Sequence, residues 1–216
     1  AAYTTYYFCV AAVNHNGIAS AFTALGSTRT VPMPLAAPVI AGFAGVFNSS
    51  ITASWGLVTG ATGYSLLAST EALNPPLTVW ASSTPVGLTA TAATVFAPAL
   101  DANTSYYLFV RANGSNNSSA YSAYPATVTL ASAPGALPFA SVSASAIAST
   151  WTAGVPGNPV GTLYELQAST AANFTGIVSS SLTYNVSVSS SGLNANTTYY
   201  FAVRALNHAG AATAFT

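Results

Sequence analysis

One segment of the sequence occurs three times, and this repeat constrains the fold more than any other feature. Residues 193–205 read LNANTTYYFAVRA, residues 100–112 read LDANTSYYLFVRA, and a shorter copy, TTYYFCVAA, spans residues 4–12. Successive copies lie about 100 residues apart. A period of this length is typical of small all-β domains joined in tandem. We therefore expect an array, which favours a structural or adhesive role over catalysis.

Short β-favouring segments alternate along the chain with clusters of Gly, Pro, Asn and Ser, at the spacing of a β-sandwich. No window has the 3.6-residue apolar period of an amphipathic helix. The pattern predicts strands at residues 50–55, 64–69, 78–81, 92–96, 105–112, 126–130, 146–151, 163–169, 184–188 and 198–205. The fold class that we expect is all-β.

The chain carries very little charge, and this excludes several kinds of partner. Only 3% of its 216 residues are charged and the formal net charge is zero, against about 25% charged residues in an ordinary domain. Without a basic patch, nucleic acid is a poor partner. No run of about 18 to 20 apolar residues is free of Pro and Gly, so we expect no membrane span. A surface without net charge lacks the repulsion that keeps folded domains apart, so we expect it to be buried in an assembly or covered by sugars.

Matched positions in the two long repeats resemble the fibronectin type III domain, as found in bacterial or archaeal extracellular tandem-repeat proteins. Proline-rich entries precede strands that end in tryptophan, and the pattern Leu-x-x-x-Thr-x-Tyr resembles the tyrosine corner of that family. The resemblance implies tandem immunoglobulin-like β-sandwiches. It also implies that the core contains the matched aromatic residues Trp55, Tyr64, Tyr106, Trp151, Tyr164 and Tyr199.

The resemblance divides the chain into three parts. Residues 1–29 would supply only the last two strands of a domain, residues 30–130 a whole domain, and residues 131–216 a domain with a shortened last strand. An isolated pair of strands is marginal in water and an unfinished sheet exposes an edge. We therefore expect each end to be completed by more protein, either the continuing polypeptide or an adjacent copy in a polymer.

Residues that could carry chemistry are few and dispersed, so we expect no enzyme, cofactor or metal. His15 and His208 fall in different repeats and are expected in solvated loops. The carboxylates Glu71, Asp101 and Glu165 are isolated in the sequence, which disfavours a two-carboxylate site. There is no Cys/His cluster for zinc and no phosphate-binding glycine motif.

Asn-x-Ser/Thr triplets are the one modification motif present in number. A chain rich in Asn, Ser and Thr also produces such triplets by chance, so glycosylation and coincidence both remain open. The candidate sites are Asn48, Asn103, Asn113, Asn116, Asn117, Asn173 and Asn196, and Asn185, in an expected strand, is the weakest.

Alternation along the repeated strand predicts an outer face, because the neighbouring tyrosines should point inward. Tyr7, Tyr107, Tyr200 and Phe109 would lie on this face, with Cys9 beside Tyr7. Such aromatic residues either cover the sheet or contact a neighbouring subunit or sugar. Cys9 is the only cysteine, so it is either a small strand residue or forms an intermolecular disulfide.

Three functions fit these observations. The first is a structural repeat protein of an extracellular filament, sheath or surface layer, with copies of itself as partners. The second is an adhesin stalk or carbohydrate-binding module, for which glycans are the partners. The third is a set of spacer repeats in a larger secreted enzyme. All three place the chain outside the cell or on its surface.

Overall fold

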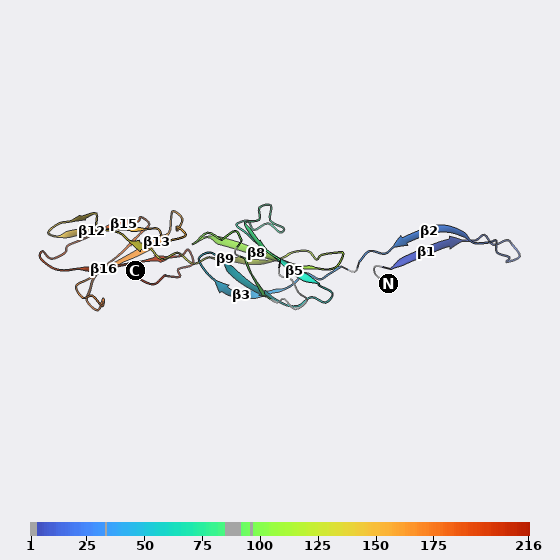
Figure 1. Ribbon diagram of the computed structural model, residues 1–216, viewed down its shortest axis with the longest axis horizontal. Helices are drawn as coiled ribbons and strands as arrows, with labels where there is room; N and C mark the ends of the chain where they lie inside the picture. The colour runs from blue at the N-terminus through green and yellow to red at the C-terminus, as the bar shows by residue number, and fades with distance from the viewer. Residues whose placement is uncertain (1–3, 33, 85–91, 96) are drawn as a thin grey trace.

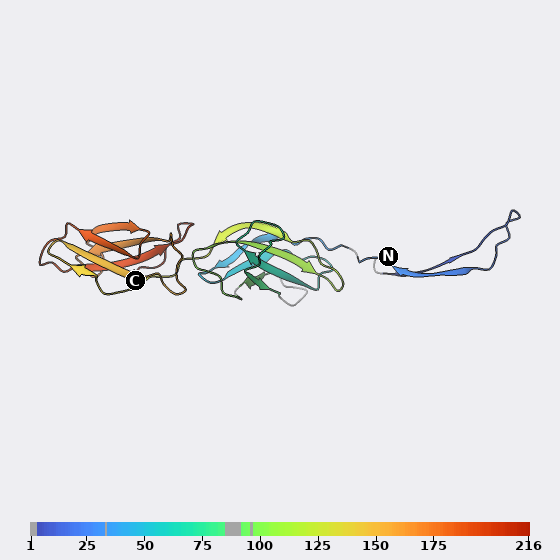
Figure 2. The ribbon, with the colours of Figure 1, turned by 90° about the horizontal axis from the view of Figure 1, so that it is seen from above.

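The computed structural model describes residues 4–32, 34–84, 92–95 and 97–216, and all of its regular structure is β. Three parts follow one another along a single long axis, as both views show (Figures 1 and 2). We call them the N-terminal hairpin, the central sandwich and the C-terminal sandwich. Among the described residues no helix is long and apolar enough to cross a membrane. The all-β fold class expected from the repeat is confirmed.

The N-terminal hairpin consists of β1 (Thr5–Val10) and β2 (Thr23–Arg29), paired antiparallel. A bulge between Phe8 and Cys9 lies opposite Gly26, whose φ of 101° is a conformation that side-chain-bearing residues rarely adopt. All residues of both strands are exposed. The hairpin therefore has no core of its own.

The central sandwich packs one three-stranded and one four-stranded sheet. The first has the order β3 (Ile40–Val46), β4 (Ile51–Trp55), β7 (Ala92–Val95); the second has the order β6 (Ala81–Ser83), β5 (Gly63–Ser69), β8 (Ser105–Asn113), β9 (Ser122–Val128). All of these pairs are antiparallel. Two hydrophobic faces thus meet, which is the usual solution for amphipathic sheets.

Aromatic rings pack within the core of this sandwich and, at Trp80, against its rim. The ring centroids of Trp55 and Tyr64 are 5.4 Å apart, and Trp80 lies 6.3 Å from Tyr106. Tyr64 and Tyr106 are completely buried and Trp55 nearly so, together with aliphatic residues such as Ile51. Burying each large apolar side chain stabilises the fold by about 1.5–3 kcal/mol.

The C-terminal sandwich repeats this plan with a looser core. One sheet is formed by β10 (Gly135–Ala136), β11 (Ser141–Val142), β12 (Ala146–Thr152) and β15 (Ser187–Ser191); the other has the order β14 (Ile177–Thr183), β13 (Leu163–Ser169), β16 (Tyr200–Leu206). Trp151 and Tyr164 are buried with ring centroids 5.7 Å apart. Tyr199, the counterpart of Tyr106, is only half-buried.

Residues after β16 turn back along that strand. Val203 and Thr216 exchange both backbone hydrogen bonds, at 3.1 and 3.0 Å, and the Thr213 amide donates to the carbonyl of Ala205 at 2.9 Å. The half of β16 nearest the chain end is thereby paired. Among the described residues, no strand pairs with the edge of the other half, from Tyr200 to Ala202, on this side.

The expected and observed strands differ at several places. Strands β3, β10, β11 and β14 were not predicted, β6 begins three residues later than expected, and β9 begins four residues earlier. Strand β14 contains the run Ser179–Ser181, and β3 contains Gly42 and Gly45. Neither sequence alternates apolar and polar residues, so neither has the signature of a half-buried strand. Strand β15 is also shifted, beginning at Ser187 where 184–188 was expected.

Candidate functional site

A polar joint connects the central and C-terminal sandwiches, and Asn103 lies at its centre. Asn103 is fully buried and has the left-handed backbone conformation, with φ of 47°. Its Nδ2 donates to Thr162 Oγ1 at 2.8 Å, and its Oδ1 accepts from the backbone amide of His208 at 2.6 Å. Both partners belong to the C-terminal sandwich. Asparagine tolerates positive φ better than other side-chain-bearing residues, so this position suits the residue.

Asn207 makes the second contact across the joint. Its Nδ2 donates to the carbonyl of Thr129 at 3.1 Å, while its Oδ1 accepts from the amides of Ala209 and Ala211 at 3.1 and 2.7 Å. The Asn207 side chain therefore stabilises its own turn and also binds the central sandwich. Asn207 is 6% exposed, so water competes poorly for these bonds.

Asn158 fixes the segment that links the two sandwiches. Its Oδ1 accepts from the Ser132 amide at 2.7 Å and its Nδ2 donates to the Ser132 carbonyl at 2.8 Å. On the other side, Asn48 Nδ2 donates to Ser132 Oγ at 3.2 Å. Side chains from both sandwiches thus bond to the same linker residue, Ser132.

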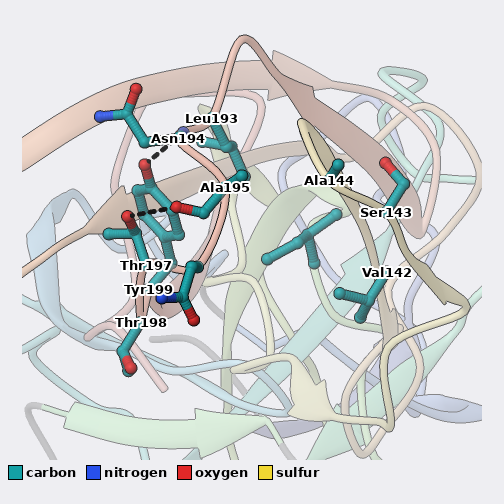
Figure 3. Close-up of a pocket in the computed structure, with 11 residues that line it drawn as sticks. Val142, Ser143, Ala144, Leu193, Asn194, Ala195, Thr197, Thr198 and Tyr199 are labelled. Atoms are coloured by element: carbon teal, nitrogen blue, oxygen red, sulfur yellow. Dashed lines mark hydrogen bonds between the residues drawn. The ribbon is translucent and has the colours of Figure 1, made fainter.

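A groove of about 310 Å³ opens on the C-terminal sandwich (Figure 3). Residues 142–144 form one wall and residues 193–199 form the other. Within it, the Tyr199 hydroxyl accepts from the Asn194 amide at 2.8 Å, and Thr197 Oγ1 donates to the Ala195 carbonyl at 3.2 Å. Both bonds lie within one wall, so neither closes the groove.

The tyrosine-corner bond is present in both sandwiches. The Tyr106 hydroxyl accepts from the Asp101 amide at 3.0 Å, as Tyr199 does from Asn194. Burial raises the pKa of Tyr106 above its usual value, and the neighbouring Asp101 charge acts in the same direction. The buried phenol therefore stays neutral and serves only as a structural hydrogen-bonding group.

The residues that we expected on an outer face are not all exposed. Tyr7 is 83% exposed, Tyr200 is 41% exposed and Cys9 is an exposed free thiol, whereas Tyr107 is half-buried. Phe109 is fully buried, so placing it on an exposed face was wrong. It lies on strand β8, between β5 and β9 in the sheet. In the segment after β5, Asn74 donates to the carbonyl of Tyr121, the residue before β9, at 3.1 Å.

The candidate glycosylation sites fall into two groups by what their side chains contact. The Nδ2 atoms of Asn48, Asn103 and Asn113 donate to Ser132, Thr162 and Ser65. Because a glycan attaches through Nδ2, the complete burial of Asn103 within the joint argues against a glycan at this residue in the folded chain. The side chains of Asn116, Asn173, Asn185 and Asn196 are exposed, and Asn117 is half-buried.

One ion pair is found among the charged side chains that the structure describes. The part of the chain that the structure describes holds no group of three His, Cys, Asp or Glu residues able to bind a metal. Arg204 pairs with Glu165 at 2.7 Å, and Gln167 and Ser180 also donate to this carboxylate, at 2.9 and 3.1 Å. Burial raises the pKa of Glu165, but these hydrogen bonds outweigh it and the pKa falls below its usual value. This ion pair braces two strands, β13 and β16.

Part of the chain matches a known domain family, and its fold is similar to that of a solved two-domain segment. Residues 132–215 match the family model described as the fibronectin type III domain. A two fibronectin type-III domain segment from chicken tenascin is similar with a TM-score of 0.57 and 12% identity, over 83% of this chain and 95% of that one. A structure of chicken CNTN1 FN1–FN3 domains aligns over 100% of this chain and 77% of that one, with a TM-score of 0.38 and 17% identity. None of the curated proteins matches.

The sequence alone did not reveal the joint. Asn103 was recognised only as a triplet and as part of the repeated turn, while Thr162, Asn158 and Asn207 were not recognised as functional. Asn207 did carry a signal, because Asn-His recurs at residues 14–15 and 207–208. A polar pair conserved between repeats in a loop indicates a contact, but its partners lie in another domain and no local pattern identifies them.

Proposed function

We propose that this chain is a structural repeat protein that builds an extracellular filament, sheath or surface layer from end-to-end β-sandwiches. The division into a partial repeat at residues 1–29, a whole one at 30–130 and a third at 131–216 belongs to this proposal. The proposal also includes a location outside the cell, a bacterial or archaeal source and a non-catalytic role.

The observation that carries the proposal is the joint. Asn103 and Asn207, both buried, hold the central and C-terminal sandwiches together through neutral hydrogen bonds. A spacer that needs only to separate two modules works with a flexible linker. A buried contact instead fixes the angle between repeats, which a regular filament requires.

The surface supports the same reading. Large apolar residues are exposed on every part, among them Phe22 at 72%, Leu77 at 84% and Val160 at 103%. Together with zero net charge, this surface favours association over dispersal. Burial against neighbouring copies would cover it, and glycans at exposed sites such as Asn116, Asn173 and Asn196 would cover part of the rest.

An adhesin stalk is the second candidate, supported by one observation. Tyr7 presents its ring to solvent on the outermost part of the rod, and exposed aromatic rings are suited to contacts with sugars. This function shares the rigid rod but needs no self-association.

Assembly of the purified chain separates these two functions. We expect sedimentation velocity to show species that grow with protein concentration, and negative-stain electron microscopy to show regular polymers. The Cys9→Ala variant is the control, because it must assemble equally if disulfides are not the cause. A chain that remains a dispersed monomer at every concentration, and native material without regular polymers, would overturn the structural role.

A further inference from the structure

A hollow of about 300 Å³ lies on the C-terminal sandwich, beside the joint. Its floor is a row of side chains across one sheet. Leu163 of β13 faces Leu206 of β16 in the strand register, and Tyr184, the residue after β14, continues the row. Tyr164, the neighbour of Leu163, is buried in the core, so alternation along β13 directs Leu163 to the outer face of the sheet.

Polar groups surround this apolar floor. The turn after β16 supplies the His208 imidazole, and the loop before β13 supplies the backbone of Gly161, whose φ of 91° is a conformation that glycine accepts. Among the described residues, no hydrogen bond is found for the Tyr184 hydroxyl, the His208 imidazole or the Gly161 amide. The hollow therefore combines an apolar floor with unpaired polar groups at its rim.

The hollow is open although the adjoining domain is in place. Two residues of its wall, Asn207 and His208, bond to Thr129 and Asn103 of the central sandwich. His208 makes this bond with its main-chain amide, and the residue is exposed. Contact between the sandwiches thus positions the rim and leaves the hollow accessible.

The central sandwich lacks this apolar floor. Gly63 and Asn113 face each other there at the positions that Leu163 and Leu206 occupy in the C-terminal sandwich. The Asn113 side chain instead donates from Nδ2 to Ser65 Oγ at 2.8 Å. The apolar floor is therefore not a requirement of the sandwich fold, which indicates a role particular to this repeat.

The chemistry of the hollow defines the ligand that it fits. Tyr184 is 67% exposed, so its ring is available for stacking. None of the described residues that line the hollow is charged, and the next pair on the same strands, Glu165 and Arg204, neutralise each other at 2.7 Å. A matching ligand is uncharged, with an apolar face and polar groups around its edge. A pyranose sugar has this form, because its C–H groups gather on the face of the ring and its hydroxyls project from the edge.

We propose that this hollow binds a neutral sugar ring, stacked on Tyr184 above the Leu163 floor, with hydroxyls bonded to the His208 imidazole and the Gly161 backbone. Its volume lies at the lower end of the range of about 300–1,000 Å³ for small-molecule sites, which suits a short stretch of a sugar chain. The inference goes beyond the proposed function, because it gives the rod a ligand and needs no self-association. A repeat with such a site would attach the rod to a neutral polysaccharide.

Saturation-transfer NMR tests the site with defined probes. The probes are the neutral hexasaccharides of glucose, xylose, mannose and N-acetylglucosamine, and an oligogalacturonate is the charged comparison. We expect at least one neutral probe to receive magnetisation from the chain and the oligogalacturonate to receive none. Titration with the neutral probe that binds then gives an apparent Kd for each variant.

Two matched pairs of variants place the binding. Tyr184→Ala should weaken it by about tenfold, because ring stacking is lost, whereas Tyr7→Ala, at an even more exposed tyrosine of the hairpin, should leave it unchanged. His208→Ala should weaken it by about threefold, because one hydrogen bond is lost while the main-chain bond to Asn103 stays. His15→Ala, at the corresponding position of the hairpin, should have no effect. All four side chains are exposed, so thermal unfolding should match that of the unchanged chain.

The outcomes separate the sugar site from the proposed function. Transfer to no neutral probe, or to the oligogalacturonate alone, would overturn the inference. Binding that Tyr184→Ala leaves unchanged, or that Tyr7→Ala weakens equally, would also overturn it, because the sugar would then lie elsewhere on the chain. Polymers of a chain that binds no sugar would leave the structural role intact. A dispersed monomer that binds a neutral probe through Tyr184 would support the sugar site and contradict the structural role.

Discussion

Asn103 and Asn196 occupy the same place in their repeats and share the left-handed backbone conformation, with φ of 47° and 53°. Asn103 is completely buried and bonded to the next sandwich, whereas Asn196 is exposed. The turn therefore determines the backbone conformation of the asparagine, and contact with a neighbouring domain determines whether its side chain is buried. This pair provides an internal control, since the same substitution at both positions separates the role of the joint from that of the turn.

Substitution of Asn103 by glycine should loosen the joint. Glycine accepts positive φ, so only the side-chain bonds to Thr162 and His208 are lost. Losing bonds to buried groups costs about 1–3 kcal/mol per group left unpaired. We expect small-angle scattering to show a wider range of angles between the sandwiches, and the Asn196→Gly variant to scatter as the unchanged chain does. Identical scattering from both variants would contradict a rigid role for Asn103.

Removing the tyrosine-corner hydroxyl should affect the two sandwiches unequally. Tyr106→Phe leaves the Asp101 amide without its partner beside a fully buried ring, and should lower the free energy of unfolding by about 1–3 kcal/mol. Tyr199→Phe should cost less, because the open groove lets water reach the Asn194 amide. Urea denaturation of both variants gives the comparison. Equal losses would show that burial does not decide the effect.

Acid should weaken the C-terminal sandwich through Glu165. Its pKa is lowered in the folded chain, so the carboxylate stabilises the fold above its unfolded pKa of about 4.3, and this contribution is lost as the pH falls through the folded value. Unfolding free energies measured in urea between neutral and acid pH should show this loss. The Glu165→Gln variant should be less stable at neutral pH and should lack this part of the acid dependence. A variant with an unchanged pH profile would exclude the ion pair with Arg204 as the cause.

Shortening an apolar side chain should lower the free energy of unfolding at a buried position and leave it nearly unchanged at an exposed one. Ile51→Ala removes methyl groups from a completely buried site and should cost about 2–5 kcal/mol. Val160→Ala changes a fully exposed side chain and should stay within about 0.5 kcal/mol of the unchanged chain. Thermal unfolding of the two variants checks this difference, and a large loss at Val160 would indicate a contact with another copy.

Local patterns in the sequence predicted much of the fold. The all-β class follows from strand segments such as β4 and β8, whose alternation and flanking turns are local properties. Burial of Phe109 could not be predicted, since alternation gives the face of a residue but not what crosses that face. Asn74, in the segment after β5, bonds the carbonyl of Tyr121, just before β9, and no local pattern specifies where such a segment lies.

The site was less accessible to sequence analysis than the fold. Asn103 looked like a modification motif because three residues define that motif, whereas its real partners are 59 and 105 positions away.

The joint between the sandwiches is made of carboxamides, hydroxyls and backbone groups, and the donor on His208 is its main-chain amide rather than its imidazole. Dissolved ions screen attractions between charges over a distance of about 8–10 Å but leave buried neutral hydrogen bonds almost untouched. Salt should therefore have little effect on the hydrogen bonds of the joint. Protons do not disturb the joint directly either, because none of its bonded groups titrates near neutrality. We therefore expect the angle between the two sandwiches to be the same at low and at high salt concentration.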